Sequence, residues 1–321
     1  MRSIITAIAL CAIGACATPA TAQEWPSKPI RAITTTSPGG LSDVFMRALG
    51  EELRARLGQP VIVENRPGGG MNIGTRACAE ATPDGYTVCI LHTESLTYNM
   101  FLYQKPGYDP DKQLQPVSNL FFMSQAVLVS SALNAKTIDD LVAASKAKPG
   151  TLSYSTASPA MMLYMESLKQ QKGADWVRVP FKGGGDAING ILNGTTPISI
   201  VGVGNALGQI RSGHIIPIAI GNPIRSPLLP EVPTITEAGY AGVPSSDWYG
   251  LFVPAGTPKA IVDKLSATVT AIEADKAFAE KNIIGRGLVP AANTPDAFAA
   301  DILKQRAQAQ QVIKAANLPM R

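Results

Sequence analysis

Serine hydroxyls and bare glycine backbone follow a β-branched run near the start of the chain. Residues 30 to 36 have the pattern of a strand, and an amphipathic helical pattern from Phe45 to Leu57 comes soon after them. A helix start offers unpaired N–H groups and a partial positive charge, so hydroxyls placed there favour binding of a carboxylate or a phosphate. The residues of this turn that could form an anion site are Ser37, Gly39, Gly40, Ser42 and Asp43.

The same turn has a plainer interpretation, in which its residues only cap the following helix. Ser42 or Asp43 can serve as that cap, and Asp43 is expected to orient the turn rather than to touch an anionic ligand. Gly58 is expected to end the helix.

Three other turns repeat the arrangement of a β-branched run followed by glycines or hydroxyls. They are residues 64 to 70 (Glu-Asn-Arg-Pro-Gly-Gly-Gly), 155 to 158 (Ser-Thr-Ala-Ser) and 180 to 185 (Pro-Phe-Lys-Gly-Gly-Gly). Lys182 would supply a positive charge, unless it is an ordinary surface lysine, and Phe181 would flank an apolar or aromatic ligand. Glu64 and Arg66 are expected to form a structural ion pair. Further candidates for the site are Thr93, Ser155, Thr156, Ser158, Gly183 and Asn205.

The elements that position these turns alternate along the chain. Strands followed by helices predict an α/β fold with largely parallel sheets. Ligands of open α/β sheets bind at the carboxyl ends of strands, where all four turns lie. Two turns come before about residue 75 and two after about residue 150, so we expect two sheets that face each other across a ligand cleft. Helices at about 258 to 273 and 295 to 316 are expected to dock on the first domain.

The start of the chain has the pattern of a secretory signal peptide. A short basic segment precedes the apolar residues 4 to 17, and Ala20-Thr21-Ala22 supplies a small-x-small cleavage site. We therefore expect export to the periplasm and cleavage after Ala22. The alternative is a lipoprotein anchored through Cys16, because residues 13 to 16 resemble a bacterial lipobox. The mature chain of about 299 residues is long enough for two domains.

The cysteines, histidines and charged residues bear on whether the protein has a disulfide, binds a metal or binds nucleic acid. Cys78 and Cys89 are expected in a helix and in the strand that returns beneath it, so an oxidising periplasm would join them, the alternative being two buried thiols. His92 and His214 lie at no ligand spacing from a cysteine, so we expect no metal site. The formal net charge is +4, and the basic residues are scattered along the chain rather than clustered, which argues against nucleic acid as a partner. No cofactor is expected.

A set of further motifs completes the pattern. In chain order they are Ser37-Pro38-Gly39-Gly40 with Asp43, Val63 to Gly70, Pro83-Asp84-Gly85-Tyr86-Thr87, Tyr108-Asp109-Pro110, Val179-Pro180-Phe181-Lys182-Gly183, Arg225 to Thr234, Glu237-Ala238-Gly239-Tyr240 and Trp248 to Pro258. With these motifs the mature chain resembles the Bug (TctC-like) family of periplasmic solute-binding proteins. Members of that family are the capture components of tripartite tricarboxylate transporters.

The resemblance implies a two-lobed, type II-like periplasmic binding protein fold with a ligand cleft between the lobes. It places lobe 1 at residues 23–123 plus 245–321 and lobe 2 at 124–244. A ligand carboxylate would be held by the loops of lobe 1, often with ordered waters, and lobe 2 would close over it. Membrane permease subunits would be the protein partners, and we expect a monomer.

One segment departs from the family pattern. The loop at 155 to 163 usually reads Ser-x-Gly-x-Gly-Ser/Thr followed by His-Leu, whereas here it lacks those glycines and the histidine and contains Met161 and Met162. A more apolar pocket wall would follow. This favours a less polar or aromatic dicarboxylate over an amino acid.

Two other functions compete with solute capture. A periplasmic hydrolase on a similar scaffold would need a nucleophile motif, but the sequence has no Gly-x-Ser-x-Gly and no His-Glu-x-x-His. A sensor that presents its liganded form to a receptor would use the same pocket. We therefore expect a protein that is not an enzyme and that binds a small organic carboxylate.

Overall fold

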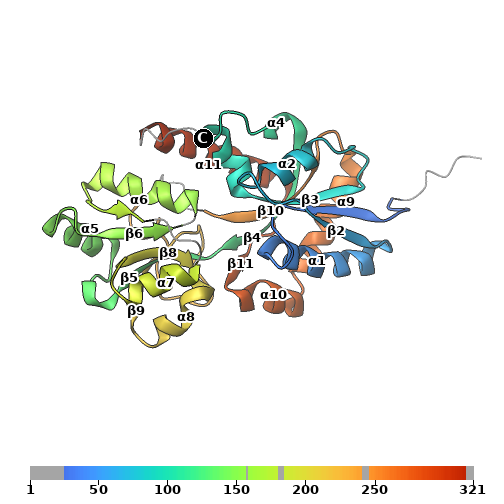
Figure 1. Ribbon diagram of the computed structural model, residues 1–321. Coiled ribbons are helices and arrows are strands. Elements are labelled where there is room, and N and C mark those ends of the chain that lie inside the picture. The colour runs from blue at the N-terminus through green and yellow to red at the C-terminus, as the bar shows by residue number, and fades with distance from the viewer. Residues whose placement is uncertain (1–24, 157, 180–183, 241–245, 316–321) are drawn as a thin grey trace, which may run out of the picture.

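Two α/β lobes lie side by side, and the chain passes between them twice (Figure 1). The computed structural model describes residues 25–156, 158–179, 184–240 and 246–315. We call the part built on the six-stranded sheet lobe 1 and the part built on the five-stranded sheet lobe 2. The expected signal peptide lies outside the described residues.

Lobe 1 has the strand order β11-β4-β10-β3-β1-β2. Its strands are β1 (Ile30–Thr34), β2 (Val61–Asn65), β3 (Thr87–His92), β4 (Leu114–Met123), β10 (Trp248–Pro254) and β11 (Leu288–Pro290). Its helices are α1 (Leu41–Leu57), α2 (Asn72–Ala79), α3 (Asn99–Leu102), α4 (Pro110–Gln113), α9 (Lys259–Glu273), α10 (Lys276–Asn282) and α11 (Pro295–Ala315), with a π-helical turn at Glu94–Tyr98. The two helices predicted near the C-terminus are thus present at nearly the predicted limits.

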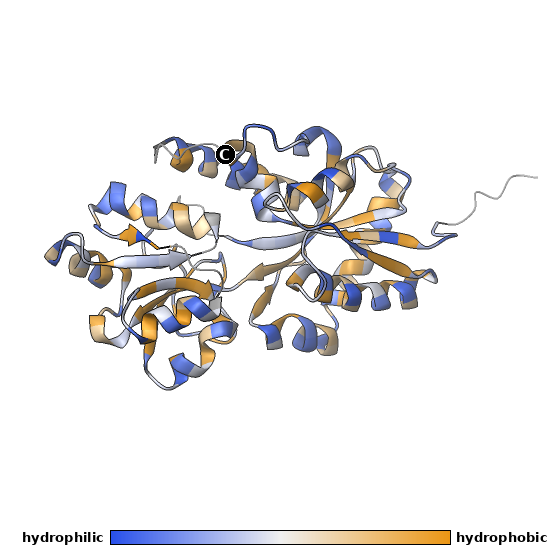
Figure 2. Cartoon of the chain, viewed as in Figure 1, coloured by the Kyte–Doolittle hydropathy of each residue, from blue (hydrophilic) through white to orange (hydrophobic). Residues whose placement is uncertain are grey.

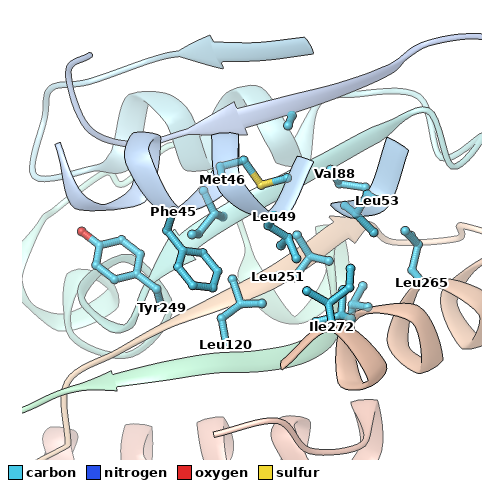
Figure 3. Packing of buried hydrophobic residues seen from close by; sticks show 14 of the residues in the cluster. Phe45, Met46, Leu49, Leu53, Val88, Leu120, Tyr249, Leu251, Leu265 and Ile272 are labelled. Carbon is cyan, nitrogen blue, oxygen red and sulfur yellow. The ribbon is translucent and has the colours of Figure 1, made fainter. Parts of the chain in front are cut away.

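Helix α1 buries one apolar face in the core of lobe 1. Phe45, Leu49 and Leu53 recur at helical spacing, and all three are buried against the sheet and α9 (Figure 3). Gly58 ends the helix in the left-handed conformation, with a φ of 76°, as predicted. Because this face is fixed on the sheet, the start of α1 is held at the carboxyl end of β1.

Lobe 2 has the strand order β7-β6-β8-β5-β9. Its strands are β5 (Gln125–Ser130), β6 (Ser153–Thr156), β7 (Val177–Arg178), β8 (Ile198–Gly202) and β9 (Ile215–Ile220), and its helices are α5 (Ile138–Ala147), α6 (Pro159–Lys172), α7 (Gly184–Leu192) and α8 (Val203–Arg211). One apolar cluster, with Tyr154 and Trp176, packs under α5 and α6, and a second, with Ile188 and Val201, packs under α7 and α8. Figure 2 shows the apolar residues gathered on the strands and on the inner helix faces.

The sheets are mixed, which corrects the prediction of largely parallel sheets. Only β2-β1-β3 and β7-β6-β8 are parallel, while β10 is antiparallel to both β3 and β4, and β5 is antiparallel to both β8 and β9. The helical periodicity revealed the βα units, but β10 enters its sheet from the other lobe. Because β10 is not joined to a preceding strand of its own sheet by a crossover helix, nothing in the local pattern indicates whether β10 runs parallel or antiparallel to its neighbours.

The chain changes sheet between β4 and β5, at Ser124, and again between β9 and β10. We call the region around Ser124 and the start of β10, where the chain passes from one lobe to the other, the crossing. The lobe limits at 124 and 244 stay a prediction. In the part of the chain that the structure describes, no helix is both long and apolar enough to cross a membrane.

The lobes contact each other on two sides of the crossing. On one side, α6 of lobe 2 joins lobe 1 in an apolar cluster that includes the C-terminal helix; its buried members are Tyr98, Leu102, Ala160, Leu163, Ala309 and Ile313. On the other side, Gly204 of α8 lies against Gly287, and a Cβ atom on Gly287 would lie 3.2 Å from the Gly204 nitrogen. The lobes are therefore in close contact in this conformation.

A disulfide joins Cys78 to Cys89, as predicted. It links α2 to β3 with a Cα–Cα distance of 6.2 Å, and both residues are buried. Removing a bridge between residues 11 apart enlarges the entropy of the unfolded chain.

The double change Cys78→Ala/Cys89→Ala should lower the free energy of unfolding by about 3 kcal/mol, because it restores this loop entropy. Urea denaturation under oxidising conditions measures the difference. The same measurement on the reduced wild-type protein should give a similar loss, and equal stability of the oxidised wild type and the variant would contradict the prediction.

Candidate functional site

The carboxyl ends of the parallel strands in both lobes point at the crossing. Tyr249, near the start of β10, pairs with His92 at the end of β3. Gln125, at the start of β5, pairs with Gly202 at the end of β8. Since β5 and β10 both begin directly after a crossing, β3 and β8 must end there, and their parallel neighbours end on the same side.

Helix N-termini therefore converge on this region from both lobes. Helices α1 and α2 follow β1 and β2, and α6, α7 and α8 follow β6, β7 and β8. The two longest, α1 with 17 residues and α6 with 14, belong to different lobes. Each N-terminus carries a partial positive charge and unpaired N–H groups, so the region between them favours an anion.

Asp43 organises the turn between β1 and α1. It accepts hydrogen bonds from the Gly39 N–H at 2.8 Å, from Arg47 Nε at 3.0 Å and from Asn65 Nδ2 at 3.0 Å. Burial works to raise the pKa of this carboxyl, but the hydrogen bonds from Arg47, Gly39 and Asn65 outweigh it and hold the pKa below its ordinary value. The carboxylate oxygens of Asp43 thus accept from the turn, from α1 and from the end of β2.

Ser37 and Gly39 lie exposed on this turn, and Ser42 is buried beneath it. The Ser42 hydroxyl is 2.7 Å from the hydroxyl of Thr36, a residue that the sequence indicated only as the end of a strand. The N-cap residue is Gly40, which corrects the expectation that Ser42 or Asp43 would cap the helix, since both lie inside its first turn. A Cβ atom on Gly40 would lie 2.6 Å from Thr36 Oγ1. Glycine is therefore required for this close packing.

The glycine-rich turn at 64 to 70 is fixed from outside by polar side chains. Asn99 Nδ2 donates to the Gly70 carbonyl at 2.8 Å, and Asn72 Oδ1 accepts from Asn99 at 2.7 Å and from the Tyr108 hydroxyl at 2.8 Å. Glu64 and Arg66 form the ion pair expected of them. Nothing in the local pattern indicated Asn72 or Asn99, because they meet only in the folded lobe.

In lobe 2, the predicted hydroxyls occupy different places. Ser155 is buried, and its hydroxyl is hydrogen-bonded to that of Ser199 at 2.6 Å, inside the sheet. Thr156 Oγ1 accepts from the Ser158 N–H at 3.2 Å, and Ser158 is the N-cap residue of α6. Asn205 lies exposed in the first turn of α8. Thr156 and Ser158, rather than Ser155, stand at the end of β6.

The two methionines of α6 also differ in position. Met161 is fully buried in the core of lobe 2, so it does not form a pocket wall. Met162 is partly exposed, with its sulfur 3.2 Å from Arg178 Nη1. Arg178, which sequence reasoning missed, also donates from Nη2 to the Thr156 carbonyl at 3.4 Å and brings a cation to the end of β7.

Of the remaining predicted site residues, one lies at the crossing and three lie outside the described residues. Thr93 follows β3 and is buried, and its hydroxyl has no hydrogen-bond partner among the described residues. Phe181, Lys182 and Gly183 lie outside the described residues. No cluster of three or more metal-ligating side chains occurs among the residues that the structure describes.

A buried ion pair, absent from the sequence predictions, lies at the crossing itself. His92 Nε2 is 2.8 Å from Asp247 Oδ1, and both side chains are almost fully buried. Burial works to lower the pKa of His92, but the Asp247 carboxylate outweighs it and raises that pKa above the ordinary value. Burial works to raise the pKa of Asp247, which His92 and the hydrogen bonds from Ser158 and Gln125 lower instead.

Two mixed α/β lobes with anion-favouring groups at the crossing define the class of two-lobed solute-binding proteins. The family model described as "Tripartite tricarboxylate transporter family receptor", TctC, matches residues 45–318. The chain therefore belongs to the TctC family. BugT of Bordetella pertussis is 32% identical over 295 residues, which cover 90% of this chain and 90% of BugT.

Solved structures agree with this assignment. The periplasmic binding protein BugD is 29% identical with a TM-score of 0.71, covering 92% of this chain and all of that one (100%). R. palustris Rpa4515 with adipate is 26% identical with a TM-score of 0.76 and coverages of 93% and 100%. MatC from Rhodopseudomonas palustris with bound malate is 27% identical with a TM-score of 0.70 and coverages of 90% and 100%. BugD is a periplasmic binding protein and the family is described as a transporter receptor, in agreement with the expectation that the chain is not an enzyme.

The change Asp43→Asn should lower the free energy of unfolding by about 2 kcal/mol at pH 7, because a buried charged acceptor of three hydrogen bonds is lost. Since the pKa of Asp43 is lowered in the folded protein, its contribution is fully present above the ordinary value of 3.8 and is lost as the pH falls further.

Urea denaturation at several pH values tests this prediction. Glu51→Gln is the matched control on the same helix, because Glu51 pairs with Arg54 at an exposed position. A variant difference that stayed constant down to pH 2, or an equal loss in the control, would contradict the role assigned to Asp43.

Proposed function

We propose that the chain captures a small organic carboxylate between its two lobes and delivers it to the membrane subunits of a tripartite tricarboxylate transporter. The observation that carries this proposal is the convergence of helix N-termini from both lobes on the crossing. Hydroxyls of Ser37 and Thr156 and the guanidinium of Arg178 stand at the same strand ends. These groups suit an anion with oxygen acceptors.

The similar proteins narrow the ligand class. Rpa4515 was solved with adipate and MatC with malate, and both molecules carry two carboxylates. In this chain, the first turn of α1 would hold one carboxylate in lobe 1. Arg178 and the first turn of α6 would face the second in lobe 2. We therefore propose a dicarboxylate as the ligand.

The free energies of a few hydrogen bonds to a carboxylate are large enough for micromolar affinity. A hydrogen bond to a charged group contributes about 1.5 to 3 kcal/mol, so about five of them exceed the ~8 kcal/mol that micromolar affinity requires. The excess offsets the loss of translational freedom and the ordering of side chains.

The start of the sequence and the family both support a periplasmic compartment. Family members are periplasmic binding proteins, and residues 1 to 22 have the pattern of a cleaved signal peptide. Export and cleavage after Ala22, action as a monomer and contact with permease subunits are parts of the same proposal. The disulfide fits an oxidising compartment.

Calorimetric titration of the purified mature chain against mono-, di- and tricarboxylates tests the proposed function. We expect micromolar affinity for at least one dicarboxylate and no heat of binding with the corresponding diamide, which has no charge. Lack of binding across the whole acid panel would contradict the proposal.

The change Gly40→Ala should weaken dicarboxylate binding by about ten-fold, because its Cβ would force Thr36 and the first turn of α1 apart. Gly208→Ala in α8 is the matched control, since among the described residues no atom beyond its chain neighbours and its own helix backbone lies within 4 Å of the added Cβ. Calorimetry on both variants measures the two affinities, and equal values would show that the turn between β1 and α1 is not part of the binding site.

A further inference from the structure

The buried side-chain carboxylate of Asp247 contacts residues of both lobes. It lies directly before β10 and is 2% exposed. Its oxygens contact His92 Nε2 at 2.8 Å and accept from Gln125 Nε2 at 3.3 Å, and the nearby Ser158 side chain helps to lower the pKa of the carboxyl. These partners come from the end of β3 in lobe 1, the start of β5, and the N-cap of α6 in lobe 2.

We propose that Asp247 and His92 are positioning residues for ligand capture. Their buried pair holds the N-terminus of α6 at the crossing, and its net charge makes the affinity for an anionic ligand depend on pH. This inference rests on the proposed carboxylate-binding function, which it extends to residues that need not touch the ligand.

The positioning role follows from what Ser158 does. Ser158 caps α6, and its hydroxyl accepts from the Met161 N–H at 3.4 Å. The same side chain lies close enough to Asp247 to lower the pKa of its carboxyl, so the first turn of α6 lies beside the residue that leads into β10. Ala160 and Leu163 of this turn also pack against Tyr98 of lobe 1. The end of α6 that would face the ligand thus packs against an apolar cluster of lobe 1 and lies beside the Asp247 carboxylate.

The charge of the pair depends on His92 and its neighbours. On the side of the π-helical turn, the Glu94 N–H donates to Nδ1 at 3.3 Å, which favours the neutral ring because Nδ1 must be unprotonated to accept, whereas the charge of the Glu94 carboxylate favours the imidazolium. The Tyr249 ring of β10 lies 4.6 Å from the imidazole ring, centre to centre. Burial raises the pKa of both Tyr98 and Tyr249, so these phenols stay neutral. Among these neighbours, Asp247 and Glu94 are the charged groups that act on His92, and Asp247 has the larger effect.

The sign of the pH dependence follows from these charges. Since the pKa of His92 is raised above 6.5, the imidazolium stabilises the folded protein fully below pH 6.5 and loses this effect as the pH rises through the folded value. Above it, Asp247 leaves a net negative charge at the crossing. That charge opposes an anion held by the nearby helix N-termini, so affinity should fall with rising pH.

The chain offers a matched control, because it contains only two histidines. His214 lies exposed in lobe 2, where its Nδ1 is 2.7 Å from the Ser212 hydroxyl. In His214→Gln, His92 is the single imidazole, so its titration can be followed directly by NMR between pH 5.5 and 9. We expect a midpoint above 6.5 that falls in the double variant with Asp247→Asn.

Calorimetry with adipate and with malate at pH 6.5 and 8.5 measures the effect on binding. Affinity of the wild type and of His214→Gln should fall about ten-fold between the two pH values, and that of His92→Gln less than two-fold. Equal pH dependence in His92→Gln and wild type would overturn the charge role. If the wild type bound no acid of the mono-, di- and tricarboxylate panel at either pH, the proposed function would fail instead.

Hydrogen exchange of the free protein decides the positioning role without a ligand. Asp247→Asn and the milder Ser158→Ala should both speed exchange of the amides at 161 to 163 at least five-fold and leave those of α5 unchanged. Unchanged exchange in Ser158→Ala, with the fold intact by circular dichroism, would overturn the proposal.

Discussion

The direction in which β5 and β10 leave the crossing constrains the rest of the structure. Each of these strands is paired antiparallel with the last parallel strand of its lobe. The parallel strands must therefore end where the crossing strands begin, and every helix that follows them must start there. Backbone pairing thus brings positive helix ends from both lobes to one region, and no cluster of basic side chains is needed to attract an anion.

The polar groups at this region divide into two kinds. Those of the α1 turn, such as Asp43 and Thr36, fix the backbone whose N–H groups would meet a ligand. Asp247 and His92 lie deeper and join segments of different lobes. Burying two charges carries a desolvation cost that mutual attraction and further hydrogen bonds offset, whereas loss of one partner leaves an uncompensated charge. Such a pair therefore specifies how the lobes meet more than it stabilises either of them.

Local pattern predicted much of the fold and the turn on which part of the candidate site rests. The apolar spacing on α1, the turn at Ser37 to Asp43, the Cys78–Cys89 bridge and the two C-terminal helices all follow from neighbours within a few turns of chain. The antiparallel entry of β10 and the pairing of His92 with Asp247 depend on contacts between distant segments, which no periodicity encodes. Ser155 illustrates the same limit, because its hydroxyl meets Ser199 on a neighbouring strand. Residue type indicated a donor, but only the sheet determined which way it faces.

The central place of β10 has a consequence for how the protein is made. Lobe 2 uses one continuous stretch of chain, from β5 to β9, whereas the sheet of lobe 1 has β10 between β3 and β4. During synthesis or passage through a membrane from the N-terminus, β1 to β4 emerge first but lack their middle neighbour. Lobe 2 can complete its sheet before lobe 1 does, and the edges of β3 and β4 stay unpaired until residues 248 to 254 arrive. Open strand edges invite pairing with other chains, so this interval is when the nascent protein most needs protection from aggregation.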